Sequence, residues 1–210
     1  MRLSRAGTMD PSALLEVVAM MRRLRGECGW KAAQTHRTLA RHLLEETYET
    51  LEAIESDGPD RDDHLREELG DLLLQVLFHA AIAEQEGRFD LDDVAAGLAT
   101  KLRHRNPHVF GDLVETDPVR INDAWEAAKA TEKQRDDLWE GIPAALPALA
   151  LAAKVLERHE RAGIAAPAPV EQPDPATAVG EELLGCVERA RSQGVDPEQA
   201  LRDAVRRRRP

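Results

Sequence analysis

Two clusters of acidic residues, spaced for two consecutive helices, constrain the fold of this chain more than any other feature. The first cluster is Glu45, Glu46 and Glu49, and the second is Glu68 and Asp71. At about 3.6 residues per turn, residues three or four apart lie on one side of a helix, so each cluster forms a compact acidic face. Like charges at this spacing destabilise a helix by about 0.2–0.5 kcal/mol per pair. A positively charged group should therefore offset the repulsion.

The apolar residues around the two clusters differ. On the first helix, apolar residues lie opposite the carboxylates, a pattern that a solvated acidic surface also explains; they are Leu44, Tyr48, Leu51 and Ile54. On the second, apolar residues flank the carboxylates on both sides, so we expect a helix that is buried nearly all round; they are Leu65, Leu69, Leu72, Leu73, Leu74, Val76 and Phe78. Unpaired charge in such a setting is costly, and metal coordination is a common remedy.

The ligand chemistry indicates which metal ion to expect. Oxygen ligands without Cys or His favour a hard cation, so Mg²⁺ is the expected ion and Mn²⁺ a possible substitute. A di-iron helical bundle would require Glu-x-x-His on its helices, and the sequence contains no such motif. It also contains no P-loop, which argues against an ordinary ATPase or GTPase.

Composition narrows the functional class. Hydrophobic residues make up 42% of the 210 residues but aromatics only 3%, so the core should consist of Leu, Ala and Val in an all-α fold. A net charge of −11 argues against binding nucleic acid or an anionic membrane, yet permits a small phosphorylated ligand neutralised by metal ions. The two distant cysteines suggest neither a disulfide framework nor a zinc site. Without a membrane-spanning run or a signal peptide, we expect a cytoplasmic protein.

Several recognisable segments accompany the acidic clusters. They are Gly-Glu-Cys-Gly-Trp at 26–30, Gln-Thr at 34–35, Leu-Glu-Glu-Thr-Tyr-Glu at 44–49, Glu-Leu-Gly-Asp-Leu-Leu at 68–73 and Lys-Leu-Arg-His-Arg-Asn-Pro-His-Val-Phe at 101–110. Together they resemble the MazG-type all-α nucleoside triphosphate pyrophosphohydrolases, relatives of dimeric dUTPases and phosphoribosyl-ATP pyrophosphohydrolases. The resemblance implies an all-α catalytic domain that is like a four-helix bundle and is completed by homodimerisation.

The resemblance also implies a reaction and a set of site residues. The reaction is hydrolysis of an NTP or dNTP to the monophosphate and pyrophosphate, with clearance of aberrant nucleotides as one role. Glu45, Glu46, Glu49, Glu68 and Asp71 would hold Mg²⁺. Glu46 and Glu49 are the expected catalytic carboxylates, and we assign the proton of the attacking water to Glu46 because it lies at the edge of the acidic face. Two alternatives stay open: a nucleotide-binding or regulatory module without turnover, and an acidic helical interaction protein.

Four more residues are candidates for contact with the substrate. Lys101 and Arg105 lie four apart on one helix face, and the resemblance assigns them to the triphosphate, although cations in a last turn also complement the helix dipole. Trp30, in an expected loop, is either a packed anchor or a platform for a base. Lys129, in a Trp-Glu-x-x-Lys pattern, either reaches a phosphate or is solvated.

Start and stop signals place the expected helices. Asp10-Pro11 starts the first, which ends near Gly26. The acidic helices cover 35–55 and 62–86, and the short connection between them predicts an antiparallel pair whose acidic faces share metal ions. Further helices are expected at 90–105, 121–133 and 142–161.

Four regions follow from these signals. We expect a MazG catalytic domain at 1–133, a helical connector at 134–164 and a linker rich in Pro and Ala at 165–178. The remainder, 179–210, is expected to be a degenerate remnant of a second MazG-like unit with one helix at 179–191. In that remnant, Val179 and Glu182 stand where the resemblance would place the Glu and Asp of the second motif.

Overall fold

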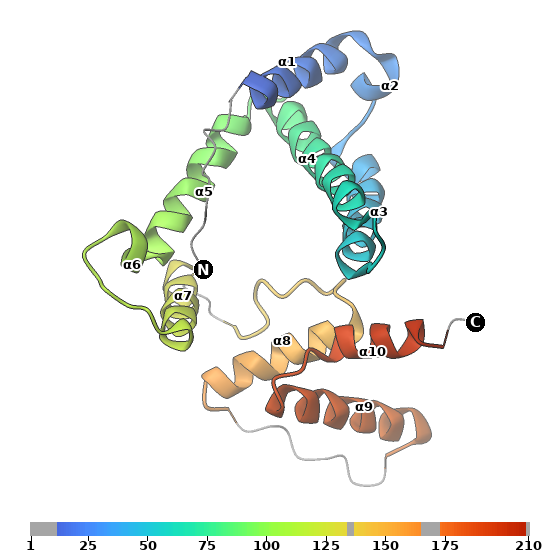
Figure 1. Ribbon diagram of the computed structural model, residues 1–210, viewed down its shortest axis with the longest axis vertical. Coiled ribbons are helices and arrows are strands. Elements are labelled where there is room, and N and C mark those ends of the chain that lie inside the picture. Colours follow the sequence, from blue (N-terminus) through green and yellow to red (C-terminus); the bar gives the residue numbers. More distant parts are fainter. Residues whose placement is uncertain (1–11, 134–136, 165–172, 209–210) are drawn as a thin grey trace. The chain divides into compact units, whose positions relative to one another are not determined.

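The computed structural model describes residues 12–133, 137–164 and 173–208, and over these ranges the chain is helical without any strand (Figure 1). The helices are α1 (Ser12–Glu27), α2 (Gly29–Ala32), α3 (His36–Glu55), α4 (Arg61–Gln85), α5 (Leu91–Arg105), α6 (Pro107–Phe110), α7 (Pro118–Lys133), α8 (Ala148–Arg161), α9 (Pro175–Ser192) and α10 (Pro197–Arg206). The predicted all-α class is confirmed. None of these helices has an apolar stretch long enough to cross a bilayer.

The chain divides into two compact units, 1–122 and 123–210, with the boundary inside α7. The second unit therefore includes the end of α7 together with the regions that the sequence suggested as connector, linker and remnant. The predicted division at 133, 164 and 178 and the origin of the last region as a remnant stay predictions. Residues 165–172 of the expected linker, and the Asp10-Pro11 helix start, lie outside the described residues.

In the first unit, α3 and α4 lie along one another, α1 packs on α4, and α5 contacts α4 (Figure 1). Leu39, near the start of α3, shares a buried cluster with Leu77 and Phe78 in the second half of α4. Thr50, near the end of α3, lies instead beside the backbone of Glu68, in the first half of α4. The two helices are therefore antiparallel, as their short connection predicted.

Local chemistry explains where these helices begin and end. Thr35 caps α3, since its Oγ1 accepts from the Thr38 backbone N–H at 3.2 Å while Thr38 Oγ1 accepts from the Thr35 N–H at 2.9 Å. Asp90 caps α5 in the same reciprocal way with Asp93. Beyond α4, Gly87 takes a φ of +67°, a left-handed conformation that suits glycine and stops the helix. The predicted bounds of α3, α4 and α5 hold within a residue or two.

The predicted burial of α4 is wrong for its first half. Leu69 is 52% exposed, and Leu73 and Val76 are also exposed, whereas the second half from Leu77 to Ala83 is largely buried. The reason is that α1 joins α3 against α4 only around Leu77, so the outer side of the first half has no covering helix in the single chain.

The orientation of α3 also differs from the simple amphipathic interpretation. Its Leu44, Tyr48 and Ile54 are exposed, and Leu44 is 57% accessible. The side of α3 that meets α4 carries Leu39, Glu46, Thr50 and Ala53, and the last of these is fully buried. The acidic face thus turns toward α4, and the apolar stripe turns away from it.

The second unit is built on α8, which packs against both α9 and α10. Val187 of α9 is the fully buried anchor of this unit, and Arg191 Nη2 pairs with Glu160 Oε2 of α8 at 2.8 Å. These contacts tie the C-terminal helices to the region that was predicted as a connector.

Three helix predictions in the second half of the chain need correction. Helix α7 begins at Pro118 rather than 121, and α8 begins only after Pro147. Instead of one helix at 179–191 there are two, α9 from Pro175 and α10 from Pro197. Each of these two starts with an Asp cap followed by Pro, the same local signal that Asp10-Pro11 carries. The starts of both helices were therefore predictable from the sequence.

Candidate metal centre

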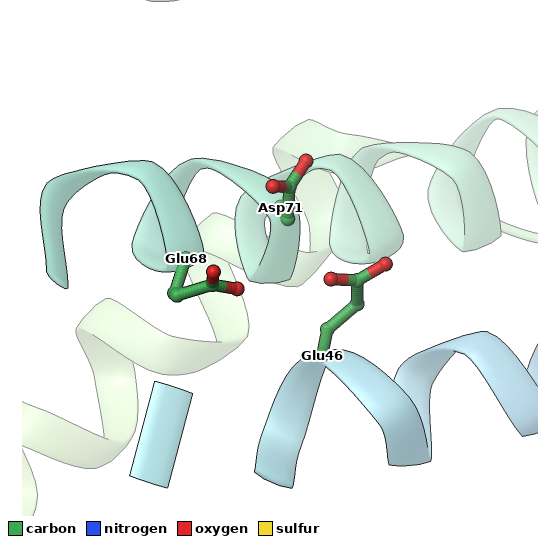
Figure 2. Close-up of side chains that lie close together, drawn as sticks. All are labelled: Glu46, Glu68 and Asp71. Carbon is green, nitrogen blue, oxygen red and sulfur yellow. The ribbon is translucent and has the colours of Figure 1, made fainter. Parts of the chain in front are cut away.

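Three carboxylates from the two acidic helices converge between α3 and α4. One oxygen each from Glu46, Glu68 and Asp71 lies within 4.8 Å of the others. Figure 2 shows Glu46 extending from α3 toward the two carboxylates of α4. Glu68 is only 8% exposed, while Glu46 and Asp71 are half-buried. We call these three residues the carboxylate cluster.

Helix packing brings the cluster together. Glu46 lies two turns after buried Leu39 and one turn before Thr50, so it falls on the side of α3 that meets α4. Thr50 Oγ1 donates to the Glu46 carbonyl at 2.8 Å and lies 3.5 Å from the Glu68 carbonyl. Small residues at Thr50 and Ala53 let the two helices approach closely. The long carboxylate side chains one turn away therefore meet across the interface.

The electrostatics of the cluster indicate excess negative charge. Burial, followed by the charges of Asp71, Glu49 and Glu68, raises the pKa of Glu46. Oε2 of Glu68 is buried and has no hydrogen-bond partner within the described residues. In that part of the chain, no Lys or Arg forms an ion pair with any of the three carboxylates, while Glu68 Oε1 lies 3.1 Å from Nε2 of His64.

These observations fit a hard divalent cation. The donors are carboxylate oxygens alone, the set that Mg²⁺ and Mn²⁺ prefer. A buried carboxylate oxygen without a partner is costly, and a cation beside it would remove that cost. The residues present therefore fit the expected metal, and the ion would also offset the repulsion raised by the two acidic faces.

The two remaining predicted acidic ligands lie differently. Glu49 is exposed beside the cluster, and its charge helps to raise the pKa of Glu46. Glu45 turns away, since its Oε2 lies 3.0 Å from His42 Nδ1 and its side chain is mostly exposed. The structure thus brings three of the five predicted acids together and places a fourth at their edge. The ligand roles of Glu45 and Glu49 stay predictions.

Trp30 lies on the short helix α2, where the sequence predicted a loop, and it is 56% exposed. The segment that carries it is held by Arg25, a buried residue that the sequence analysis missed. Its guanidinium donates to the backbone carbonyls of Lys31, Ala32 and Gln34 and to Gln85 Oε1. An arginine in the last turn of a helix is common, so no local signal marked Arg25 as this anchor.

The predicted cations lie in two different units. Lys101 and Arg105 are four residues apart on α5, as expected, with Lys101 exposed and Arg105 half-buried. Lys129 belongs to the second unit, where its Nζ bonds Glu126 Oε1 at 2.8 Å and Glu126 also pairs with Arg161 at 3.0 Å. Lys129 lines a cavity of about 580 Å³ in that unit, but the cavity's acids and cations largely pair with one another.

His64 is a further residue that the sequence analysis overlooked. It precedes Glu68 by four residues on α4, and its Nε2 is within hydrogen-bonding distance of that carboxylate. Glu-x-x-His, the arrangement of a direct di-iron ligand, does not include this histidine. The His-x-x-x-Glu spacing, which also puts both side chains on one helix face, was the available signal.

Comparison with known proteins adds an independent finding. Residues 34–110 match the family model described as the MazG nucleotide pyrophosphohydrolase domain. The chain is 48% identical over 195 residues to an uncharacterised 26.1 kDa protein of Streptomyces cacaoi, covering 91% of this chain and 78% of that protein. It is 38% identical over 213 residues to the nucleoside triphosphate pyrophosphohydrolase/pyrophosphatase MazG of Thermotoga maritima, covering 91% and 81%.

A third relative is longer. The chain is 45% identical over 195 residues to a nucleoside triphosphate pyrophosphohydrolase of Mycobacterium tuberculosis, covering 91% of this chain but 54% of that protein. The chain therefore spans about half the length of this relative. The family-model match includes all three members of the carboxylate cluster together with Lys101 and Arg105.

Proposed function

This chain belongs to the MazG family of nucleotide pyrophosphohydrolases, and from that premise we propose that it hydrolyses nucleoside triphosphates, NTP or dNTP, to the monophosphate and pyrophosphate. The observation that carries the proposal is the carboxylate cluster of Glu46, Glu68 and Asp71, with its buried oxygen lacking a partner among the described residues. Relatives named as nucleoside triphosphate pyrophosphohydrolases support the same reaction. Clearance of aberrant nucleotides is the role that we propose for it.

The cluster would hold Mg²⁺, with Mn²⁺ able to replace it. When bound there, such an ion neutralises charge on the phosphates and makes a bound water more acidic. Glu68 is buried and lies beside His64, whereas Glu46 reaches in from the facing helix and stays half-exposed to water. Glu46 is therefore the residue that we assign to accept the proton of the attacking water. Glu49, three residues after Glu46 on α3, is the second carboxylate that we propose as catalytic.

Four residues would contact the nucleotide. Lys101 and Arg105, spaced for one face of α5, would bind the terminal phosphates through charge-assisted hydrogen bonds. The exposed ring of Trp30 offers a stacking surface for a base. Nζ of Lys31 lies 5.4 Å from the centre of this ring. Lys129 would have to break its ion pair with Glu126 before it could bind a phosphate.

We also propose a homodimer. Apolar side chains on the outer sides of α3 and α4 are exposed in the single chain, although soluble proteins seldom leave a large apolar patch in water. They are Leu44, Tyr48, Ile54, Leu69, Leu73 and Val76. A second copy packed against these helices would cover them and complete a four-helix arrangement. Light scattering after gel filtration tests this, and a monomer at micromolar concentration would contradict it.

Product analysis tests the reaction. The protein is incubated with each common NTP and dNTP, and with an oxidised guanine nucleotide, in the presence of Mg²⁺ or EDTA, and the products are separated by anion exchange. We expect monophosphate and pyrophosphate with Mg²⁺ alone. Asp71→Asn should abolish release, whereas Glu67→Gln, an exposed neighbour on α4, should leave it unchanged.

The other outcomes of the same experiment discriminate between the remaining functional classes. Diphosphate and inorganic phosphate would show a different bond cleaved. Mg²⁺-dependent nucleotide binding without any product would favour a regulatory module. Neither binding nor turnover would leave the acidic helices as an interaction surface.

A further inference from the structure

We infer that His64 is a positioning residue for Glu68, holding one oxygen of this carboxylate so that the other is presented to the metal ion. This inference rests on the proposed function. His64 Nε2 lies 3.1 Å from Glu68 Oε1. The other oxygen, Oε2, is buried and has no hydrogen-bond partner among the described residues. The carboxylate therefore has two unlike ends, one held by the histidine and one left for a cation.

The benefit of this arrangement is preorganisation. A glutamate side chain has several rotatable bonds and loses rotamer freedom when it binds an ion. A contact that holds Glu68 before the ion arrives removes part of that loss. Partners of this kind, which orient a ligand without touching the metal, commonly change metal affinity by about 10–100-fold when they are removed.

The contact between Nε2 and the carboxylate requires a proton on the histidine. An ionised carboxylate only accepts, so Nε2 of His64 must carry a proton. The neutral imidazole with its proton on Nε2 and the charged imidazolium both meet this condition, so the role requires a donor and not a particular charge. A glutamine at this position keeps a donor, whereas leucine or alanine removes it.

The surroundings of His64 make it suitable for substitution. Its side chain is 45% exposed. It lines an open cavity of about 490 Å³ together with Asp60, Asp63, Arg66 and Glu67. Removing the imidazole therefore leaves no buried void, and the folded core around Leu77 lies more than three helical turns away along α4.

Arg66 provides a matched control. It lines the same cavity on the same helix, and it pairs with Asp63 at 2.9 Å rather than with any member of the carboxylate cluster. Replacing Arg66 with leucine changes the charge of the cavity and removes an ion pair, but it leaves Glu68 held by His64.

The experiment measures Mn²⁺ binding without substrate, by the electron paramagnetic resonance signal of free Mn²⁺, in the wild type and in four variants. We expect His64→Leu and His64→Ala to weaken the Mn²⁺ affinity about tenfold or more. His64→Gln should restore most of it, and Arg66→Leu should stay within about twofold of the wild type. Circular dichroism without metal confirms that each variant is folded, and pyrophosphate release is measured in parallel.

Each other result would overturn the inference. If the wild type binds Mn²⁺ and releases pyrophosphate, and both His64→Leu and His64→Ala bind Mn²⁺ as tightly as it does, the role of His64 is refuted while the proposed function stands. A glutamine variant as weak as the leucine variant would show that donation is not the function of the side chain. An equal loss in Arg66→Leu would assign the effect to the charge of the cavity. A wild type that neither binds Mn²⁺ nor releases pyrophosphate would refute the proposed function together with this inference.

Discussion

The conflict of charges in the carboxylate cluster predicts an unusual response to one substitution, Glu68→Gln. This change keeps the size of the side chain and an acceptor for His64, but it removes the most buried negative charge of the three. In the absence of metal, we expect the variant to be more stable than the wild type. Most substitutions at buried positions do the opposite.

The distances in the cluster set the size of the effect. At an effective dielectric constant of about 20, two unit charges 4.8 Å apart repel by roughly 3.5 kcal/mol, and in bulk water by roughly 1 kcal/mol. Glu68 takes part in two such repulsions, with Glu46 and Asp71. Solvent screens part of this repulsion because Glu46 and Asp71 are only half-buried, so the net gain in stability should be about 1–3 kcal/mol.

The assay is urea unfolding at a fixed protein concentration, followed by circular dichroism in EDTA and in saturating Mg²⁺. An ion at one hundred times its dissociation constant stabilises the wild type by about 2.7 kcal/mol, whereas the variant should gain far less. The advantage of Glu68→Gln in EDTA should therefore shrink by about that amount in Mg²⁺. Glu67→Gln, exposed on the same helix, serves as the control and should change stability by no more than about 0.5 kcal/mol in either condition.

Two results would refute this reasoning. Loss of stability in Glu68→Gln without metal would mean that the carboxylate already has a compensating partner. Equal stabilisation of the wild type and the variant by Mg²⁺ would mean that the ion binds elsewhere on the chain.

Three other predictions follow from single contacts. Thr35→Ala removes the cap of α3 and should lower the free energy of unfolding by about 0.5–2 kcal/mol, measured by urea denaturation. Burial and the charge of His36 lower the pKa of His79 from 6.5. The Nδ1 atoms of the two rings lie 2.7 Å apart, and Arg88 contacts both His36 and Glu86. The unfolded chain thus binds more protons, so the melting temperature should fall as pH drops below about 6.5, and a flat profile would contradict this. Lys101→Ala should lower kcat/KM for triphosphates at least tenfold without changing the melting temperature, which steady-state kinetics and calorimetry can check.

Much of the first unit follows from local chemistry and could be predicted. The bounds of α3 depend on the Thr35 cap and on the breaker after Glu55, and those of α4 on Gly87. Each of these signals acts within a few residues, so the sequence carries it completely. The same holds for the Asp-Pro starts of α9 and α10, which are local signals of the same kind.

The packing face of α3 was not predictable in this way. The 3.6-residue period shows that Glu46 and Leu44 lie on different sides of the helix, but it does not say which side meets a neighbour. Hydrophobicity alone would place Leu44 inward, whereas the expectation that the two acidic faces share metal ions turns Glu46 toward α4, as the structure does. The structure turns the small residues Thr50 and Ala53 inward instead, because they allow α4 to approach closely.

The sequence by itself determined the family, the all-α class and the two acidic clusters that we propose as the site, because helical spacing and a recognisable motif are written along the chain. Only the tertiary structure decided that Glu46, Glu68 and Asp71 converge, that Glu45 turns toward His42, and that His64 lies 3.1 Å from Glu68. The physical reason is that a helix fixes angles among its own residues, whereas the distance between carboxylates on two helices depends on how closely and on which faces those helices pack.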